Sequence, residues 1–231
     1  MIEICCGSYE DGINAYYGGA KRIELNSALY LGGLSPSVST LKLLKAKTDL
    51  KIICMVRPRA AGFCYDENEF IQMKEEAKDF LENGADGIAF GFLTKDFHVD
   101  MERTSEFVKQ IHSYQKEAVF HRAFDITPNL EESIQTLISL HVDRVLTSGG
   151  EATAIKGQET IKYLQEHFGS HIEILAGCGI NADNALEFKK YTHVKQLHSS
   201  CKSYKIDATT SNGKVSYGYY HDNEMKYEVV N

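Results

Sequence analysis

Short apolar stretches alternate with longer amphipathic segments along most of this chain. Eight of the short stretches have the β-rich apolar character of buried strands. They are residues 2–5, 22–25, 51–56, 87–90, 118–121, 144–147, 173–175 and 194–198. Residues 67–83 and 130–140 carry apolar side chains at helical spacing, which predicts helices between the strands. Ser35 and Pro36 predict an N-cap and first helical residue, and Asn83-Gly84 predicts a helix end.

This alternation predicts an α/β fold of the (β/α)8 or TIM-barrel type. Strands joined through helices run parallel, and 231 residues are enough for eight such units. A doubly wound open sheet has the same alternation, but no GxGxxG follows the first strand and a count of eight favours closure. The segment after residue 198 shows no helical pattern, so a regular eighth helix is not predicted. We assign residues 1–202 to the barrel and 203–231 to a C-terminal extension, packed on the barrel or at an oligomer interface.

Composition and charge exclude several function classes. The chain is 43% hydrophobic and 25% charged, as in soluble globular proteins, and its net charge is −7. An acidic chain lacks the basic stripe that binds nucleic acid or an anionic membrane. No secretory signal or spanning apolar run is visible, and the six scattered cysteines contain no CxxC pair. We therefore expect a cytoplasmic protein with free thiols, no nucleic-acid or membrane partner, and a homo-oligomeric state, most simply a dimer.

The alternation of side chains along the first two strands places polar groups inside the barrel. The isoleucines of the first strand share one face, so Glu3 and Cys5 share the other. The same reasoning places Glu24 and Asn26 opposite the apolar residues of the second strand. Because the apolar faces meet the surrounding helices, these four polar side chains should point inward.

Further ionisable residues fall at or just after the ends of other strands. Arg57 and Arg59 follow the third strand, His121 and Asp125 come at the end of the fifth, and His198 lies on the eighth. Barrel enzymes carry their chemistry at this end, and burying so many charges without a use is costly. The alternative is a structural network of ion pairs that fills a narrow barrel. We predict a catalytic site in which His121 exchanges a proton with a neighbouring carboxylate. The candidate catalytic residues are Glu3, Glu24, His121 and Asp125.

Two glycine-containing loops add a candidate anion site. Ser148, Gly149 and Gly150 follow the sixth strand, and Gly177 and Gly179 follow the seventh. Small residues let backbone N–H groups approach a phosphate or carboxylate, although glycines also simply form tight turns. We expect a small anionic ligand at this mouth, held by a guanidinium on one side and these loops on the other. The remaining candidate ligand-binding residues are Asn26, Arg57, Arg59 and His198.

Ordered motifs along residues 1–202 resemble those of the CutC family, which is named for copper homeostasis. They are IEICCGS at 2–8, GGAKRIELNSAL at 18–29, GGLSPS at 32–37, MVRPRAAGFCY at 55–65, GADGIAFGFLTKD at 84–96, FHRAFD at 120–125, DRVLTSGG at 143–150 and AGCGI at 176–180. The resemblance implies a cytoplasmic (β/α)8-type barrel and a role in handling copper by binding Cu(I).

The resemblance also implies copper cysteines at the ends of the first and second strands. The first corresponds to Cys5, and the second falls at Asn26, where relatives commonly have cysteine. Cu(I) favours soft thiolate ligands, so the asparagine removes one of them. Cys6 faces the opposite side of its strand and cannot replace it. The implied cofactor is therefore copper(I), with Cys5 as its metal ligand.

Two function classes remain open from the sequence. One is a copper-binding homeostasis protein, to which Cys64, Cys178 or Cys201 in loops at the same barrel end could add a thiol. The other is a barrel enzyme or binder that acts on a small anionic metabolite at the C-terminal mouth.

Overall fold

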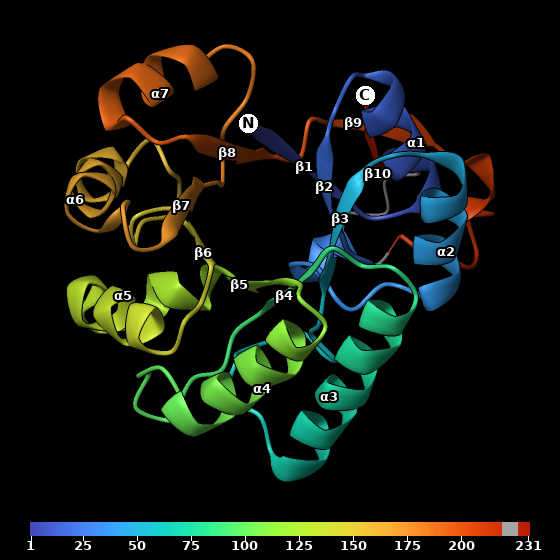
Figure 1. The fold of residues 1–231 in the computed structure, drawn as a ribbon. Helices are drawn as coiled ribbons and strands as arrows, with labels where there is room; N and C mark the ends of the chain where they lie inside the picture. The colour runs from blue at the N-terminus through green and yellow to red at the C-terminus, as the bar shows by residue number, and fades with distance from the viewer. Residues whose placement is uncertain (219–225) are drawn as a thin grey trace.

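Eight parallel strands form a closed barrel at the centre of the structure, a computed structural model that describes residues 1–218 and 226–231 (Figure 1). Each strand pairs with the next along the chain, and β8 closes the barrel by pairing with β1. The predicted TIM-type barrel is confirmed, and the open sheet is excluded. The strands are β1 (Ile2–Cys6), β2 (Arg22–Leu25), β3 (Lys51–Met55), β4 (Gly87–Phe90), β5 (Glu117–Phe120), β6 (Arg144–Thr147), β7 (Glu173–Ala176) and β8 (Gln196–Ser199).

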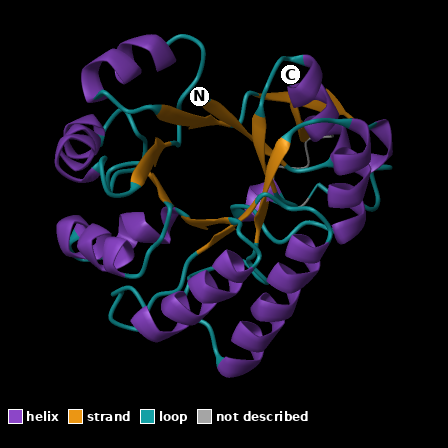
Figure 2. Ribbon diagram, in the orientation of Figure 1, coloured by secondary structure: helices purple, strands orange, loops and turns teal. Residues whose placement is uncertain are grey.

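In the described part of the chain, seven α-helices surround the barrel and cover the outer faces of its strands (Figure 2). They are α1 (Tyr9–Tyr17), α2 (Val38–Lys47), α3 (Glu67–Glu82), α4 (Met101–Ser113), α5 (Leu130–Ser139), α6 (Gln158–Phe168) and α7 (Ala185–Thr192). Three short 3-10 helices are η1 (Leu29–Leu31), η2 (Arg122–Ile126) and η3 (Ala208–Thr210). Among the residues described here, no helix is long and apolar enough to cross a membrane.

Local capping explains where the helices begin. At α3, the Asp66 carboxylate accepts the Glu69 N–H at 2.9 Å, and the Glu69 side chain accepts the Asp66 N–H at 2.8 Å. At α2 the predicted cap is wrong by two residues, because Ser37 accepts the Thr40 N–H at 3.1 Å. The Ser35 hydroxyl is used elsewhere, since it accepts the backbone N–H of Arg57 at 2.9 Å.

A hairpin takes the place of an eighth helix in the described part of the chain. Strands β9 (Lys202–Ile206) and β10 (Lys226–Val230) pair antiparallel beside α1 (Figure 1). The Val230 N–H donates to Asp11 Oδ1 at 2.8 Å, and Asn14 Nδ2 donates to the Val230 carbonyl at 3.0 Å. These bonds tie the end of the chain to the first helix of the barrel. The expected role of residues 203–231 at an oligomer interface stays a prediction, and residues 219–225 lie outside the described part.

Buried ion pairs fill the N-terminal half of the barrel interior. Glu3 Oε2 lies 2.5 Å from Arg22 Nε and 3.1 Å from Arg144 Nη1. Arg144 also pairs with Glu117 and with Glu173, and it is only 1% exposed. Each buried charge thus has an opposite charge beside it, which offsets the cost of removing it from water. This half of the barrel matches the structural-network interpretation.

The two sides of the barrel interior differ in polarity above this network. On the side of β3, β4 and β5, an apolar cluster of Ile53, Met55, Ala89 and Val119 fills the interior. The polar side chains therefore gather on β8, β1 and β2, which are neighbours in the closed sheet. This asymmetry brings the thiol, carboxylate and imidazole of Cys5, Glu24 and His198 to one side of the barrel.

Removing the Arg144 guanidinium should destabilise the barrel strongly. In Arg144→Met, the nearly fully buried Glu3 loses one of its charge partners, and we expect the free energy of unfolding to fall by about 3 kcal/mol. Urea denaturation measures this change. As a control, Lys74→Met removes a surface pair with Glu106 and should cost less than about 1 kcal/mol. Equal effects of the two substitutions would contradict the proposed importance of the interior network.

Candidate functional site

Three side chains from adjacent strands meet inside the barrel. Cys5 on β1, Glu24 on β2 and His198 on β8 each place one possible ligand atom within 4.8 Å of the others. Glu24 and His198 are buried, and Cys5 is partly buried. The register pairs Cys5 with Glu24, while Glu3 lies beside His198 and Arg22. The inward orientation predicted from strand alternation thus brings thiol, carboxylate and imidazole together.

Hydrogen bonds fix the orientation of each group in this cluster. His198 Nδ1 lies 3.0 Å from Glu3 Oε1, so Nε2 faces the other way, 3.9 Å from Glu24 Oε2. Asn26 Nδ2 donates to Glu24 Oε2 at 2.9 Å and lies 3.5 Å from Cys5 Sγ. In this cluster the Nε2 edge of His198 therefore faces the carboxylate of Glu24, and the thiol of Cys5 lies beside both groups.

Glu3 and His198 stabilise each other's charged forms. Burial acts to raise the pKa of Glu3, but its hydrogen bond to His198 and the nearby arginines outweigh it and lower the pKa. Burial likewise acts to lower the pKa of His198, yet the carboxylate of Glu24 and the bond to Glu3 raise it well above its usual range. His198 is therefore an imidazolium held between two carboxylates.

Glu24 and Cys5 hold their protons more strongly than usual. Burial raises the pKa of Glu24, and the negative charge of Glu3 adds to this, while His198 acts in the opposite direction. Burial also raises the pKa of the Cys5 thiol to about 11. A protonated imidazole therefore faces a carboxyl group of raised pKa, which is the kind of pairing that general acid–base chemistry uses.

Glu3 lies deeper than the sequence predicted. It was expected at the C-terminal mouth, but its register partner Arg22 is the first residue of β2. Its carboxylate is shared between the ion-pair network and His198. Its position suits it to orient and charge the imidazole, while Glu24 lies one layer closer to the mouth.

The loop after β6 already binds a carboxylate of the chain itself. Asp125 accepts the N–H groups of Ser148 at 3.0 Å and Gly150 at 3.1 Å, together with the Thr147 hydroxyl at 2.5 Å. The remaining amide, that of Gly149, donates to Thr147 Oγ1 at 2.8 Å. The expected external anion is therefore replaced by Asp125, which organises the loop from the end of β5.

The loop after β7 uses its glycines for packing and turning. A Cβ at Gly177 would lie 3.0 Å from His198 Cβ and 2.8 Å from Leu146 Cδ1, so glycine allows this loop to pack closely against β8 and β6. Gly179 has a φ of +80°, and its carbonyl accepts from Asn184 Nδ2 at 2.9 Å. The turn interpretation accounts for both residues, and Gly177 contributes to the site by positioning His198.

Both arginines after β3 are engaged with their own loops. Arg59 forms an ion pair with Glu69 of α3 and stacks over Tyr65. Arg57 is 6% exposed, and both of its Nη atoms are occupied by backbone carbonyls. Those carbonyls belong to Leu31 and Gly33, each at 3.0 Å, and Ala61, at 2.7 Å. The Arg57 guanidinium, predicted to bind an anion, instead connects the loops after β2 and β3 through these hydrogen bonds.

His121 lacks the carboxylate partner that the sequence interpretation gave it. Its Nδ1 accepts the Ala123 N–H at 3.1 Å, and among the described residues its buried Nε2 has no hydrogen-bond partner. Burial, followed by the nearby Arg57, lowers the pKa of His121 to about 3. A ring with so low a pKa is neutral near pH 7, which argues against the proton-transfer role predicted for His121.

Comparison with known proteins agrees with this architecture. Residues 1–203 match the CutC family. A CutC family protein of Treponema denticola is 48% identical over 218 residues, which cover 94% of this chain and 88% of the relative. This chain belongs to the CutC family. A second family member, from Vibrio vulnificus, is 38% identical over 88% of this chain and 81% of its own length.

A solved structure of the same family shares the fold. CutC from Streptococcus agalactiae, named for copper homeostasis, is 29% identical and has a TM-score of 0.81 over 87% of this chain and 98% of its own. An N-acetylmannosamine-6-phosphate 2-epimerase from Clostridium perfringens has a TM-score of 0.62 at 18% identity, which shows the barrel fold alone. The family assignment inferred from the motifs is therefore confirmed.

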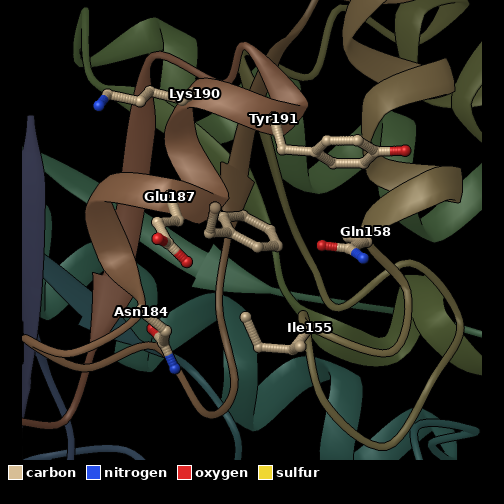
Figure 3. A pocket seen from close by; sticks show the side chains of 7 residues that line it. Ile155, Gln158, Asn184, Glu187, Lys190 and Tyr191 are labelled. Atoms are coloured by element: carbon tan, nitrogen blue, oxygen red, sulfur yellow. The ribbon is translucent and has the colours of Figure 1, made fainter.

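A separate groove between α6 and α7 contains none of the predicted site residues. It has a volume of about 730 Å³ and is lined by apolar side chains such as Ile155 and Phe188, with Glu187 and Lys190 at its edge (Figure 3). These residues lie on the helical layer, outside the barrel interior. We therefore locate the candidate chemistry in the interior cluster.

The reactivity of Cys5 tests the environment of this cluster. Because its pKa is raised to about 11, the thiol should stay protonated at pH 8 and react with iodoacetamide far more slowly than the exposed Cys64. Mass spectrometry of peptides after timed alkylation measures both rates in one sample. Alkylation of Cys5 should accelerate as the pH approaches 11. Equal rates for the two thiols at pH 8 would contradict the buried, proton-holding environment.

Proposed function

We propose that this protein is a barrel enzyme that transfers protons to and from a small metabolite at the C-terminal side of the barrel. The observation that carries the proposal is the orientation of His198, whose Nδ1 is held by Glu3 at 3.0 Å while Nε2 faces Glu24 at 3.9 Å. Acid–base pairs in enzymes usually consist of two titratable groups that face each other, while a third group holds one of them in place. Here His198 faces Glu24, and Glu3 holds His198.

The roles of the individual groups follow from their surroundings. Glu24, in its ionised form, accepts a proton from the substrate, and the imidazolium of His198 supplies one. Glu3 is a positioning residue, because it reaches His198 but lies in the layer of Arg22. The Asn26 amide holds the Glu24 carboxylate at 2.9 Å. Barrel enzymes place such groups on several different strands at this end, as here on β8, β1 and β2.

Loss of the Glu24 carboxylate should abolish proton transfer. In D2O, the wild type should exchange a carbon-bound proton in members of a panel of 2-oxo acids, hydroxy acids and sugar phosphates, followed by proton NMR. Glu24→Gln should slow that exchange by about 100-fold or more, because it removes the base while keeping the shape.

Glu106→Gln, at an exposed position on α4, serves as the matched control and should keep the wild-type rate. Exchange at an unchanged rate in Glu24→Gln would show that another group is the base. If the wild type exchanges a proton in none of the panel compounds, the proposed function itself is contradicted.

A second candidate function is copper binding in the cytoplasm, and it agrees with the name of the Streptococcus relative, which mentions copper homeostasis. One observation in this chain favours it, because Cys5, His198 and Glu24 place their ligand atoms within 4.8 Å of one another. A thiolate and an imidazole suit copper, whereas a carboxylate is a hard ligand that Cu(I) does not favour. Cys5 and His198 would hold the ion, and the thiol would have to release its proton on binding.

Asn26 limits this copper site and provides its test. Its Nδ2 lies 3.5 Å from Cys5 Sγ, so a cysteine at this position would bring a second sulfur close to the first. We expect the wild type to bind Cu(I) weakly and Asn26→Cys to bind it much more tightly, measured by competition with a chromogenic Cu(I) chelator without oxygen. Tight stoichiometric binding by the wild type that disappears in Cys5→Ala would make copper binding the better supported function.

A further inference from the structure

One buried hydrogen-bond donor at the mouth has no role in the chemistry described so far. His121 directly follows β5 and lies two residues beyond Val119, whose side chain belongs to the interior apolar cluster. Side chains two apart share a face of a strand, so the imidazole lies on the interior side, at the C-terminal end of β5. The acid–base cluster on β8, β1 and β2 lies on another side of the same barrel.

The hydrogen bonds of the ring determine which nitrogen carries its proton. Nδ1 accepts the Ala123 N–H at 3.1 Å, so in the neutral ring the proton resides on Nε2. Nε2 is buried and has no partner among the described residues. A buried polar group without a partner destabilises the fold, so a donor kept at this position indicates a ligand that accepts from it.

The surroundings hold this ring in a defined orientation. A side chain at Gly91 would lie 2.6 Å from His121 Cε1, so the end of β4 leaves space that only the imidazole fills. The Phe63 ring packs against the other side, with 4.8 Å between ring centroids. Arg57 in turn lies 5.2 Å from the centroid of Phe63, which places a fixed positive charge close to the imidazole. The donor is therefore preorganised, with positive charge nearby.

The charge state limits what His121 can do. Burial and Arg57 together lower its pKa to about 3, so the ring is neutral at any physiological pH. It can donate a hydrogen bond but cannot take up a proton. A phosphate needs several donors or cations, but both Nη atoms of Arg57 and the amides of Ser148 and Gly150 already donate within the chain. Among the described residues, this leaves only the Nε of that guanidinium without a partner. A single neutral N–H suits one oxygen on which negative charge develops during a reaction.

We propose that His121 donates its Nε2–H to the carbonyl oxygen of the substrate, and that the substrate is accordingly a carbonyl compound. This inference rests on the proposed proton-transfer function and names its substrate class. Glu24 takes the proton from the carbon next to the carbonyl group, and the electrons of that C–H bond form a carbon–carbon double bond. The carbonyl π electrons move onto the oxygen, where the N–H of His121 stabilises the resulting enolate. Return of a proton to carbon completes exchange or isomerisation without any oxidant.

Two substitutions at one position test the role of this N–H. His121→Phe keeps a ring of similar size but removes the donor, and we expect kcat for proton exchange on a carbonyl substrate to fall about 100-fold with little change in KM. His121→Gln restores an N–H donor and should recover part of the rate. An unchanged kcat in a folded His121→Phe protein, checked by its thermal melting, would overturn the inference.

The panel of 2-oxo acids, hydroxy acids and sugar phosphates separates failure of this inference from failure of the proposed function. Exchange that requires Glu24 but occurs only on the hydroxy acids, which carry no ketone or aldehyde group, would overturn the role of His121 and leave proton transfer standing. If Glu24→Gln loses exchange while His121→Phe keeps full activity, the role of His121 is likewise overturned and proton transfer still stands. Absence of exchange on every member by the wild type would overturn both.

The protonation of the ring gives a readout independent of activity. In 15N NMR of histidine-labelled protein, with His121→Gln used for assignment, the ring should show the Nε2–H neutral form from pH 8 down to pH 5. A ring that titrates within that range, or that carries its proton on Nδ1, would overturn the proposed donor.

Discussion

The carboxylate of Glu3 connects the structural half of this barrel to its chemical half. One of its oxygens lies against Arg22 and Arg144, and the other lies 3.0 Å from His198 Nδ1. Because a buried charge needs partners, the arginines below hold Glu3 ionised, and the ionised Glu3 in turn supports a charged His198 facing Glu24. The site therefore depends on an ion-pair network that lies one layer deeper in the barrel than Glu24.

The rest of the mouth is organised by groups that satisfy each other within the chain. Asp125 occupies the amides after β6, and Arg57 occupies carbonyls of the loops after β2 and β3. Both features have the chemistry of a ligand site, a glycine loop and a guanidinium fork, but each binds a partner supplied by the chain. Among the described residues, the buried side-chain nitrogens that still lack a hydrogen-bond partner include His121 Nε2, whose ring packs beside Phe63, and Arg57 Nε. Of these two, the His121 N–H belongs to a neutral ring, and the proposed substrate class rests on it.

Much of the fold and part of the site could be predicted from the sequence, because both depend on local periodicity. Strand alternation placed Cys5, Glu24 and Asn26 correctly in the barrel interior, and eight strands implied closure. Arg22 shares the face of Glu24, so the same alternation also places its side chain inside the barrel. The partners of Asp125 and the space that Gly91 leaves for the imidazole depend on contacts between strands. No spacing within one segment encodes such contacts.

The protonation state of His198 tests the central claim most directly. If Glu3 and Glu24 hold the ring as an imidazolium, 15N NMR of histidine-labelled protein should show both ring nitrogens of His198 protonated at pH 8, and Glu3→Gln should lower the pH at which the ring loses its proton. A His198 ring that titrates near or below its usual pKa of about 6.5, unaffected by Glu3→Gln, would contradict the account.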